Sequence, residues 1–273
     1  MTRIVNNCVA LVCLCLFWGQ SLRAADASHS EQIKWGNESV FNEDHNTLGL
    51  FSGVLGGQIV LAGGTSDDYS RWGRNAVCLS ENAGFALYED VLSKPLAYGA
   101  SITLSDGILC IGGRDSSQCY EDVFFVTMQQ GKLNVSEDWP PLPFPLSNAA
   151  GALLDNKVYL FGGRKSVSPS RLSDSFFVLD LSNKSRGWKE LPGYPGCVRE
   201  DAILVVQNNG VSPCLYLLGG QTETEEGLSS CLTDGYVYNP QLGKWSSLGS
   251  DFPKGICAVS YTHLRAHETD SYL

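Results

Sequence analysis

Four segments of this chain end an apolar stretch with the pair Gly-Gly, and this recurrence limits the fold more than any other feature. The second glycines of the pairs are Gly64, Gly113, Gly163 and Gly220, so consecutive pairs are 49, 50 and 57 residues apart. Two short apolar stretches precede each pair, and in three units a polar turn separates them, such as Ser-Asp-Gly at 105–107. Paired apolar stretches around a polar turn are typical of tight β-hairpins. The sequence therefore predicts a repeated β-unit of about fifty residues.

The second half of each unit repeats as well. An aromatic or apolar stretch follows the polar loop after Gly-Gly, and a tryptophan closes three of the units, at Trp139, Trp188 and Trp245. The glycines allow a strand to end beneath neighbouring backbone, where a Cβ would clash, and the tryptophan fills the wedge between adjacent units. Four strands per unit, with Gly-Gly after the second and Trp in the fourth, are the kelch signature. We therefore predict an all-β, kelch-type β-propeller with four to five blades in this chain.

The first 27 residues have the features of a signal peptide. Arg3 supplies a positive charge, and Cys8 to Trp18 form an apolar run of eleven residues, too short to span a bilayer. Small residues follow, with 25–27 as one cleavage site and 22–24 as a rival. These features predict a secreted protein of the bacterial periplasm that has no membrane attachment after signal removal.

The propeller itself is expected at residues 28–260. A fifth repeat opens at 252–259, but residues 261–273 are polar, lack alternation and never reach another Gly-Gly. We interpret 28–260 as an incomplete propeller and 261–273 as an artefactual tail, foreign to the kelch pattern. His263 and His267 in the tail have helical spacing, which alone does not indicate a metal site.

Charge and cysteine spacing exclude several classes of function. The net charge is -10, and no basic stripe offers the phosphate contacts of a nucleic-acid-binding protein. Seven cysteines remain after signal removal, without CxxC or Cys/His spacing, so we predict no metal site. An oxidising compartment would allow one disulfide, for which Cys110 and Cys119 on adjacent strands are a candidate pair.

With these units in place, the chain resembles the cyclically permuted branch of the N-acetylneuraminate mutarotase (epimerase) family. The resemblance runs from about Leu48 to Val259, and its more specific pieces are residues 61–64, 96–101, 110–113 and 194–199. It implies a secreted, six-bladed propeller that interconverts the anomers of sialic acid in sialic acid utilisation, and so an isomerase without metal or organic cofactor. The partner would be a small sugar acid, with a homodimer as an open alternative.

The implied chemistry selects candidate residues. Anomer exchange needs a base that takes the anomeric hydroxyl proton and an acid that protonates the ring oxygen, and arginine suits the substrate carboxylate. In kelch blades, the loops after the second strand and before the first open on one face, the usual mouth of the channel. That face is expected to gather Tyr98, Arg114, Asn148, Arg164, Arg199, Glu200 and Asp201. Among these, the predicted catalytic residues are Glu200 and Arg199, and the predicted substrate-binding residues are Arg114, Arg164 and Tyr98.

One alternative function remains open on the sequence alone. A secreted, non-catalytic kelch module that binds protein or glycan would have the same repeats, because this fold hosts many functions. A copper oxidase of the galactose-oxidase type is excluded, since its chemistry needs histidine ligands and the repeats contain no histidine.

Overall fold

A computed structural model describes residues 48–80, 84–223 and 228–257. The expected signal peptide (1–27) and the expected tail (261–273), with its two histidines, lie outside the described residues. None of the helices among the described residues has the length and apolar character needed to cross a membrane.

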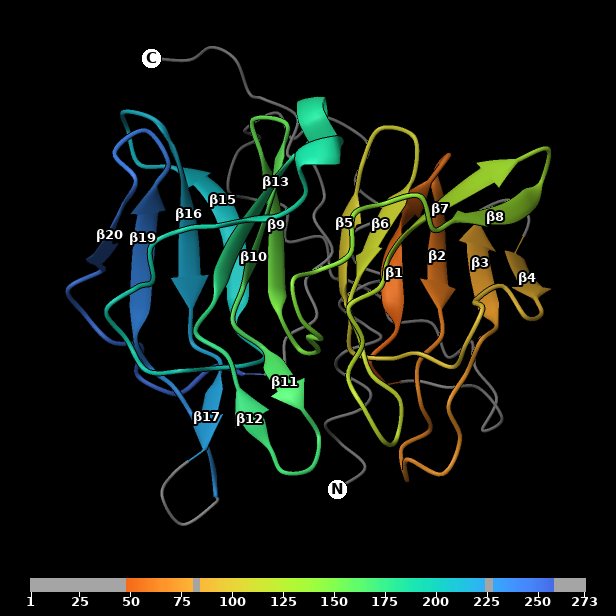
Figure 1. Cartoon of the computed structure of the whole chain (residues 1–273), viewed down its shortest axis with the longest axis horizontal. Helices are drawn as coiled ribbons and strands as arrows, with labels where there is room; N and C mark the ends of the chain where they lie inside the picture. Colours follow the sequence, from red (N-terminus) through yellow and green to blue (C-terminus); the bar gives the residue numbers. More distant parts are fainter. Residues whose placement is uncertain (1–47, 81–83, 224–227, 258–273) are drawn as a thin grey trace, which may run out of the picture. The chain divides into compact units, whose positions relative to one another are not determined.

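Four antiparallel sheets of four strands each make up most of the described residues (Figure 1). Within each of the four sheets, every strand pairs with the strand of that sheet that follows it along the chain. The first sheet holds β1 (Phe51–Leu55), β2 (Gln58–Ala62), β3 (Ala76–Ser80) and β4 (Gly84–Tyr88), and the second holds β5 (Ala100–Thr103), β6 (Ile108–Ile111), β7 (Val123–Gln129) and β8 (Lys132–Ser136). The third holds β9 (Ala150–Leu154), β10 (Lys157–Phe161), β13 (Phe176–Asp180) and β14 (Lys189–Glu190), and the fourth holds β15 (Ile203–Asn208), β16 (Pro213–Leu218), β19 (Gly235–Asn239) and β20 (Lys244–Ser247).

Two small hairpins and one short helix complete the elements. The hairpins are β11 (Arg164–Ser166) with β12 (Arg171–Leu172), and β17 (Gln221–Glu223) with β18 (Ser229–Cys231). The 3-10 helix η1 spans Leu181–Arg186. Four sheets of four consecutive strands confirm the predicted all-β propeller architecture.

The sheets pack through their apolar faces. The first strands contact one another in sequence, β1 with β5, β5 with β9 and β9 with β15. One buried cluster lies between each pair of neighbouring sheets, and these three clusters form the core. Trp139 packs against Phe125, with ring centroids 5.2 Å apart, and Trp245 packs against Phe176 at 5.0 Å. The tryptophans therefore fill the spaces between blades, as their position in the repeat predicts.

The Gly-Gly pairs hold each blade to the next. A Cβ on the first glycine would lie 2.2 Å from a backbone oxygen of the following unit at Gly63, Gly112 and Gly219, and 2.5 Å at Gly162. Those oxygens belong to Leu96, Leu146, Ile256 and Arg199. The second glycine of each pair donates its N–H to the same oxygen, over 2.7–2.9 Å. Close backbone approach at positive φ is thus the reason for glycine here.

These hydrogen bonds also fix which residues correspond between units. Leu96, Leu146, Arg199 and Ile256 all occupy one structural position. Ile256 therefore confirms the register predicted for the fifth repeat, although residues 252–257 form no strand. An arginine stands where the other units have an apolar residue.

The expected Cys110–Cys119 disulfide is wrong, because the disulfide found among the described residues joins Cys231 and Cys257. Cys110 and Cys119 are both buried and free. The side chain of Cys110 packs in the core between the first two sheets, whereas the Cys119 sulfur contacts the Ser147 hydroxyl at 3.4 Å. Cys110 is in β6, but Cys119 lies in the loop between β6 and β7, where its side chain faces a different neighbour.

Candidate functional site

The residues that lead into each first strand lie beside the residues that follow Gly-Gly. Isolated antiparallel bridges join Ala97 to Arg114, Ser147 to Arg164 and Glu200 to Gln221. The β11–β12 and β17–β18 hairpins extend from the same end of the sheets (Figure 1). The two sets of loops therefore open on one face, as predicted, and we call this face the mouth.

Three polar side chains reach the centre of the mouth from an unusual backbone conformation. Tyr98, Asn148 and Asp201 have φ values of 61°, 55° and 52°, and Gly49 occupies the corresponding position of the first sheet with φ 64°. The N–H of each residue donates to the carbonyl of its counterpart in the preceding sheet, over 2.7, 2.6 and 3.0 Å. Left-handed non-glycine residues are uncommon, and here a continuous run of hydrogen bonds across four sheets holds them.

A cavity of about 120 Å³ lies along these residues. It is lined by Tyr98, Asn148 and Asp201 and by residues at the beginnings of β1, β5, β9 and β15. Sites for small molecules generally measure roughly 300–1,000 Å³. A ligand larger than this cavity would therefore fill it with only one part and extend outward over the mouth.

Asp201 is a partly buried carboxyl group in the cavity wall. Its Oδ1 accepts from Asn148 Nδ2 at 2.9 Å, and its Oδ2 accepts from Gln221 Nε2 at 2.9 Å. Burial raises the pKa of Asp201 to about 6, and the negative charge of Glu200 adds to the rise. Such a carboxyl changes its protonation state near neutral pH, which is the property of a proton-transfer group.

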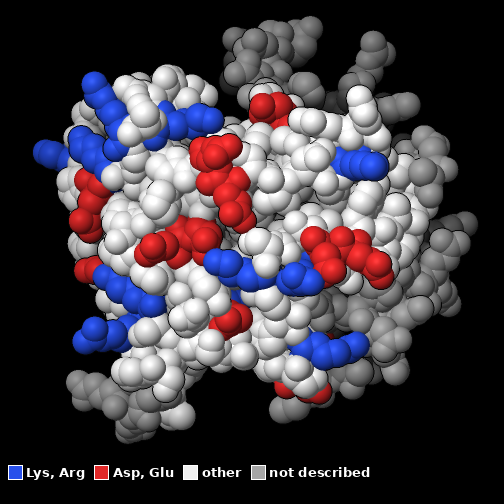
Figure 2. Space-filling view, turned by 45° about the vertical axis from the view of Figure 1, so that its right-hand side comes forward, with Lys and Arg blue, Asp and Glu red and all other residues white. Residues whose placement is uncertain are grey.

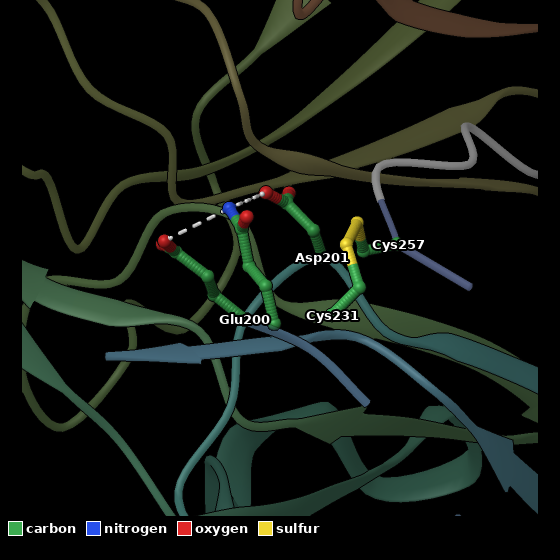
Figure 3. The surroundings of a disulfide bond; sticks show 5 residues. Glu200, Asp201, Cys231 and Cys257 are labelled. Atoms are coloured by element: carbon green, nitrogen blue, oxygen red, sulfur yellow. Dashed lines mark hydrogen bonds between the residues drawn. A yellow bond between two sulfur atoms is a disulfide. The ribbon is translucent and has the colours of Figure 1, made fainter. Parts of the chain in front are cut away.

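Glu200 and Arg164, two predicted site residues, are brought together and pair with each other. Arg164 Nε donates to Glu200 Oε2 at 2.8 Å, and Arg164 Nη2 donates to Glu200 Oε1 and, at 3.0 Å, to Glu223 Oε1. Gln221 Nε2 lies 3.3 Å from Glu200 Oε1 and so reaches both neighbouring carboxyl groups (Figure 3). The hydrogen bond to Glu200 raises the pKa of Arg164, so the guanidinium stays charged while two acidic side chains hold it.

Arg199 does not reach the cavity. Its side chain is fully buried, and its guanidinium donates to both oxygens of Asp234 at 2.7 and 2.8 Å and to the Gly219 carbonyl at 2.7 Å. Nε donates to the Tyr194 hydroxyl at 2.8 Å. Arg199 is thus committed to contacts within the fourth unit and is not among the residues that line the cavity, so its predicted catalytic role stays a prediction.

Arg114 differs from both of these arginines. Its guanidinium lies over the Tyr98 ring at 4.7 Å and over the Trp72 ring at 5.1 Å. Its one hydrogen bond to a described residue is a long contact of 3.5 Å to the Asp115 carbonyl, and it forms no ion pair with any of them. The planar fork is therefore held by two aromatic rings while its donors remain available.

Tyr98 joins the cation to the cavity. Burial raises the pKa of its hydroxyl above the usual range, so the side chain stays neutral. The positive charge of Arg114 and the negative charge of Asp201 both act on it, and Tyr98 contacts the Arg114 guanidinium while it lines the cavity. The predicted substrate-binding pair Arg114 and Tyr98 is thus adjacent in the structure.

Neither a metal-ligand cluster among the described residues nor a surface of one charge on the face shown in Figure 2 offers a second candidate site outside the mouth. Within the ranges that the structure describes, no group of three or more His, Cys, Asp or Glu side chains is placed to hold a metal ion. Acidic and basic side chains are mixed over the face shown in Figure 2. The mouth is therefore the region where charge, cavity and aromatic surface coincide.

The sheets, the Gly-Gly ends and the mouth define a kelch-type β-propeller. Residues 139–268 match the family model of N-acetylneuraminate epimerase. The N-acetylneuraminate epimerase of Yersinia pestis (strain Pestoides F) is 30% identical over 131 residues, which are 47% of this chain and 31% of that protein. That of Haemophilus influenzae (strain PittEE) is 30% identical over 125 residues, 46% of this chain and 30% of the relative.

Two further comparisons concern the fold. A kelch domain-containing protein of Vibrio cholerae is 31% identical over 130 residues, 47% of this chain and 33% of that protein. The solved structure of YjhT superposes with a TM-score of 0.57 at 13% identity, covering 74% of this chain and 68% of that one. The chain spans about a third of the length of the curated relatives it matches. The predicted resemblance to N-acetylneuraminate epimerases is confirmed, and the family match covers the third and fourth sheets.

Sequence reasoning placed Asp201 on the mouth but gave it no role, and it did not consider Gln221. The signal for Gln221 was its position directly after Gly-Gly, which is the position of Arg114 and Arg164 in the preceding units. The raised pKa of Asp201 had no such signal, because it depends on burial that only the packed sheets create.

Proposed function

We propose that the protein is a mutarotase that interconverts the anomers of a sialic acid at the mouth, and that the substrate carboxylate binds Arg114. The observation that carries this proposal is the guanidinium of Arg114, which lies over the rings of Trp72 and Tyr98 beside the cavity with its donors uncommitted. The match of residues 139–268 to N-acetylneuraminate epimerase supports the substrate class.

A sialic acid suits the chemistry of this surface. Its carboxylate takes two parallel hydrogen bonds from an arginine fork. The buried Oδ1 of Asn148 accepts no hydrogen bond from the described residues, so it would accept one from a sugar hydroxyl or amide N–H. An unsatisfied buried acceptor costs stability until a ligand supplies a donor. The cavity would hold the anomeric part of the ring.

The reaction itself needs only proton transfer. Removal of the anomeric hydroxyl proton and protonation of the ring oxygen open the pyranose to the keto form, and closure on the other face gives the other anomer. Secretion to the periplasm and a homodimer remain predictions from the sequence and the family resemblance.

The test is the exchange rate between the two anomers of N-acetylneuraminate, measured by magnetisation-transfer NMR with and without the protein. We expect an acceleration of exchange that saturates with sugar concentration. The methyl ester, which lacks the carboxylate charge, should have a higher half-saturating concentration. An uncatalysed rate at high protein concentration would reject the proposal.

A second function follows from the same aromatic surface. Trp72 and Tyr98 would also form a stacking platform for a glycan in a non-catalytic module. Binding of N-acetylneuraminate without faster anomer exchange would identify this alternative.

A further inference from the structure

The cavity contains two ionisable side chains, Tyr98 and Asp201, among its described lining residues. The Tyr98 hydroxyl is neutral over the ordinary pH range, because burial raises its pKa. Asp201 is therefore the lining group that both accepts and releases a proton under physiological conditions.

Its hydrogen bonds leave Asp201 able to react. Asn148 and Gln221 each donate one bond, to different carboxyl oxygens. A carboxylate has about four lone-pair positions, so each oxygen keeps one for a ligand. The two amides fix the plane of the carboxyl group without occupying it.

Glu200, one residue earlier, lacks this freedom. It takes two hydrogen bonds from Arg164 and one from Gln221, and its side chain is 4% exposed. It does not line the cavity. Both of its carboxyl oxygens are already bound by the Arg164 guanidinium, so Glu200 is not placed to reach a ligand in the cavity.

We infer that Asp201 is the catalytic residue that takes the proton from the anomeric hydroxyl and returns it, with Gln221 and Asn148 as positioning residues; this inference rests on the proposed mutarotase function. In ring opening, Asp201 accepts the anomeric proton, the O–H electron pair becomes the second bond of the new carbonyl, and the bond from the anomeric carbon to the ring oxygen breaks. The ring oxygen leaves with the electron pair of that broken carbon–oxygen bond and takes a proton from solvent water at the mouth. Closure on the opposite face reverses each transfer, so no net proton is consumed.

The surrounding charges explain why the group operates near neutral pH. Glu200 and burial raise the pKa of Asp201, while Asn148, Gln221 and the charge of Arg164 lower it, leaving it at about 6. Tyr98 faces the same cavity as a neutral group. A general base works best when its pKa lies near the working pH.

The decisive variant is Asp201→Asn, which keeps the size of the side chain and one oxygen that accepts from a neighbouring amide, but removes the charge and the second acceptor. We expect the maximal exchange rate to fall by roughly 10²–10⁴-fold, the inflection near pH 6 to vanish, and binding of N-acetylneuraminate, followed by saturation-transfer NMR, to persist. A wild-type rate and pH profile in this variant would overturn the inference. Because the wild-type protein is assayed beside it, failure of the mutarotase proposal is seen separately, as no acceleration by either protein.

A second variant keeps the inference testable even if Asp201→Asn does not fold. Gln221→Ala removes one bond to the ionised form of Asp201, so the inflection of the rate profile should move to higher pH while the half-saturating sugar concentration stays within about twofold. A merely structural role would lower the rate at every pH without moving the inflection, and that result would contradict the inference even if Asp201→Asn does not fold.

Discussion

The two sides of the mouth use arginine in opposite ways. On the side built by the first two sheets, Arg114 rests on Trp72 and Tyr98 and pairs with no carboxylate among the described residues. On the side built by the third and fourth sheets, Arg164 is held by Glu200 and Glu223, in the half that matches the epimerase family model.

The difference comes from the next unit rather than from the arginines themselves. Arg114 and Arg164 both follow Gly-Gly directly and bridge to equivalent residues, Ala97 and Ser147. The residue that enters the following unit is Ser147 in the first case and Glu200 in the second. The residue that enters the following unit therefore decides whether an arginine of this repeat pairs with a carboxylate or keeps its donors available.

The largest effect should come from breaking the buried ion pair on the second side. Arg199→Ala leaves Asp234 and the Gly219 carbonyl without their donor, and we expect a loss of about 3–5 kcal/mol in the free energy of unfolding by urea. Arg199→Leu restores the residue type of the corresponding positions in other units. Combined with Asp234→Asn, it should recover most of that loss. An alanine variant as stable as the wild type would show that the pair does not hold this unit.

The next largest effect on the free energy of unfolding should come from the disulfide on this side. Cys231 and Cys257 join residues 26 apart, and replacing Cys231 by serine should lower the free energy of unfolding by about 2–4 kcal/mol. The matched control is Cys197→Ser, because Cys197 is exposed and free. Equal unfolding curves for both variants would remove the disulfide from the account.

A pH effect should distinguish Asp201 from the other carboxylates. Its pKa is about 6 in the folded protein and its ordinary value is 3.8, so the folded state binds this proton more tightly than the unfolded state. The contribution of Asp201 to the free energy of unfolding is thus largest below pH 4. About 2–3 kcal/mol of it is lost as the pH rises through about 6. Other groups also titrate, so the measured quantity is the difference in unfolding free energy between wild type and Asp201→Asn at pH 4 and pH 7. A difference that does not change with pH would contradict the raised pKa.

The repeat made most of the fold predictable. Gly-Gly, the polar turns and the closing tryptophans gave the four sheets and the common mouth, because each is a local requirement of backbone approach or packing. The burial of Arg199 was not seen. Its equivalence to Leu96 and Leu146 depends on where the chain re-enters each sheet, which the longer fourth unit obscures. The partners of Glu200 and Cys231 depend on contacts between units, where spacing along the chain gives no direct guide.

The comparison is tested most directly by Arg114→Gln and Arg164→Gln, assayed side by side for the half-saturating concentration of N-acetylneuraminate in anomer exchange. Arg186→Gln, at an exposed position on η1 away from the mouth residues, is the control. Arg114→Gln should raise this concentration by roughly 10–100-fold, the loss of about 1.5–3 kcal/mol expected for hydrogen bonds to a charged group, whereas Arg164→Gln should mainly lower stability. An unchanged half-saturating concentration in Arg114→Gln, with a large rise in Arg164→Gln, would contradict the assignment of the two sides.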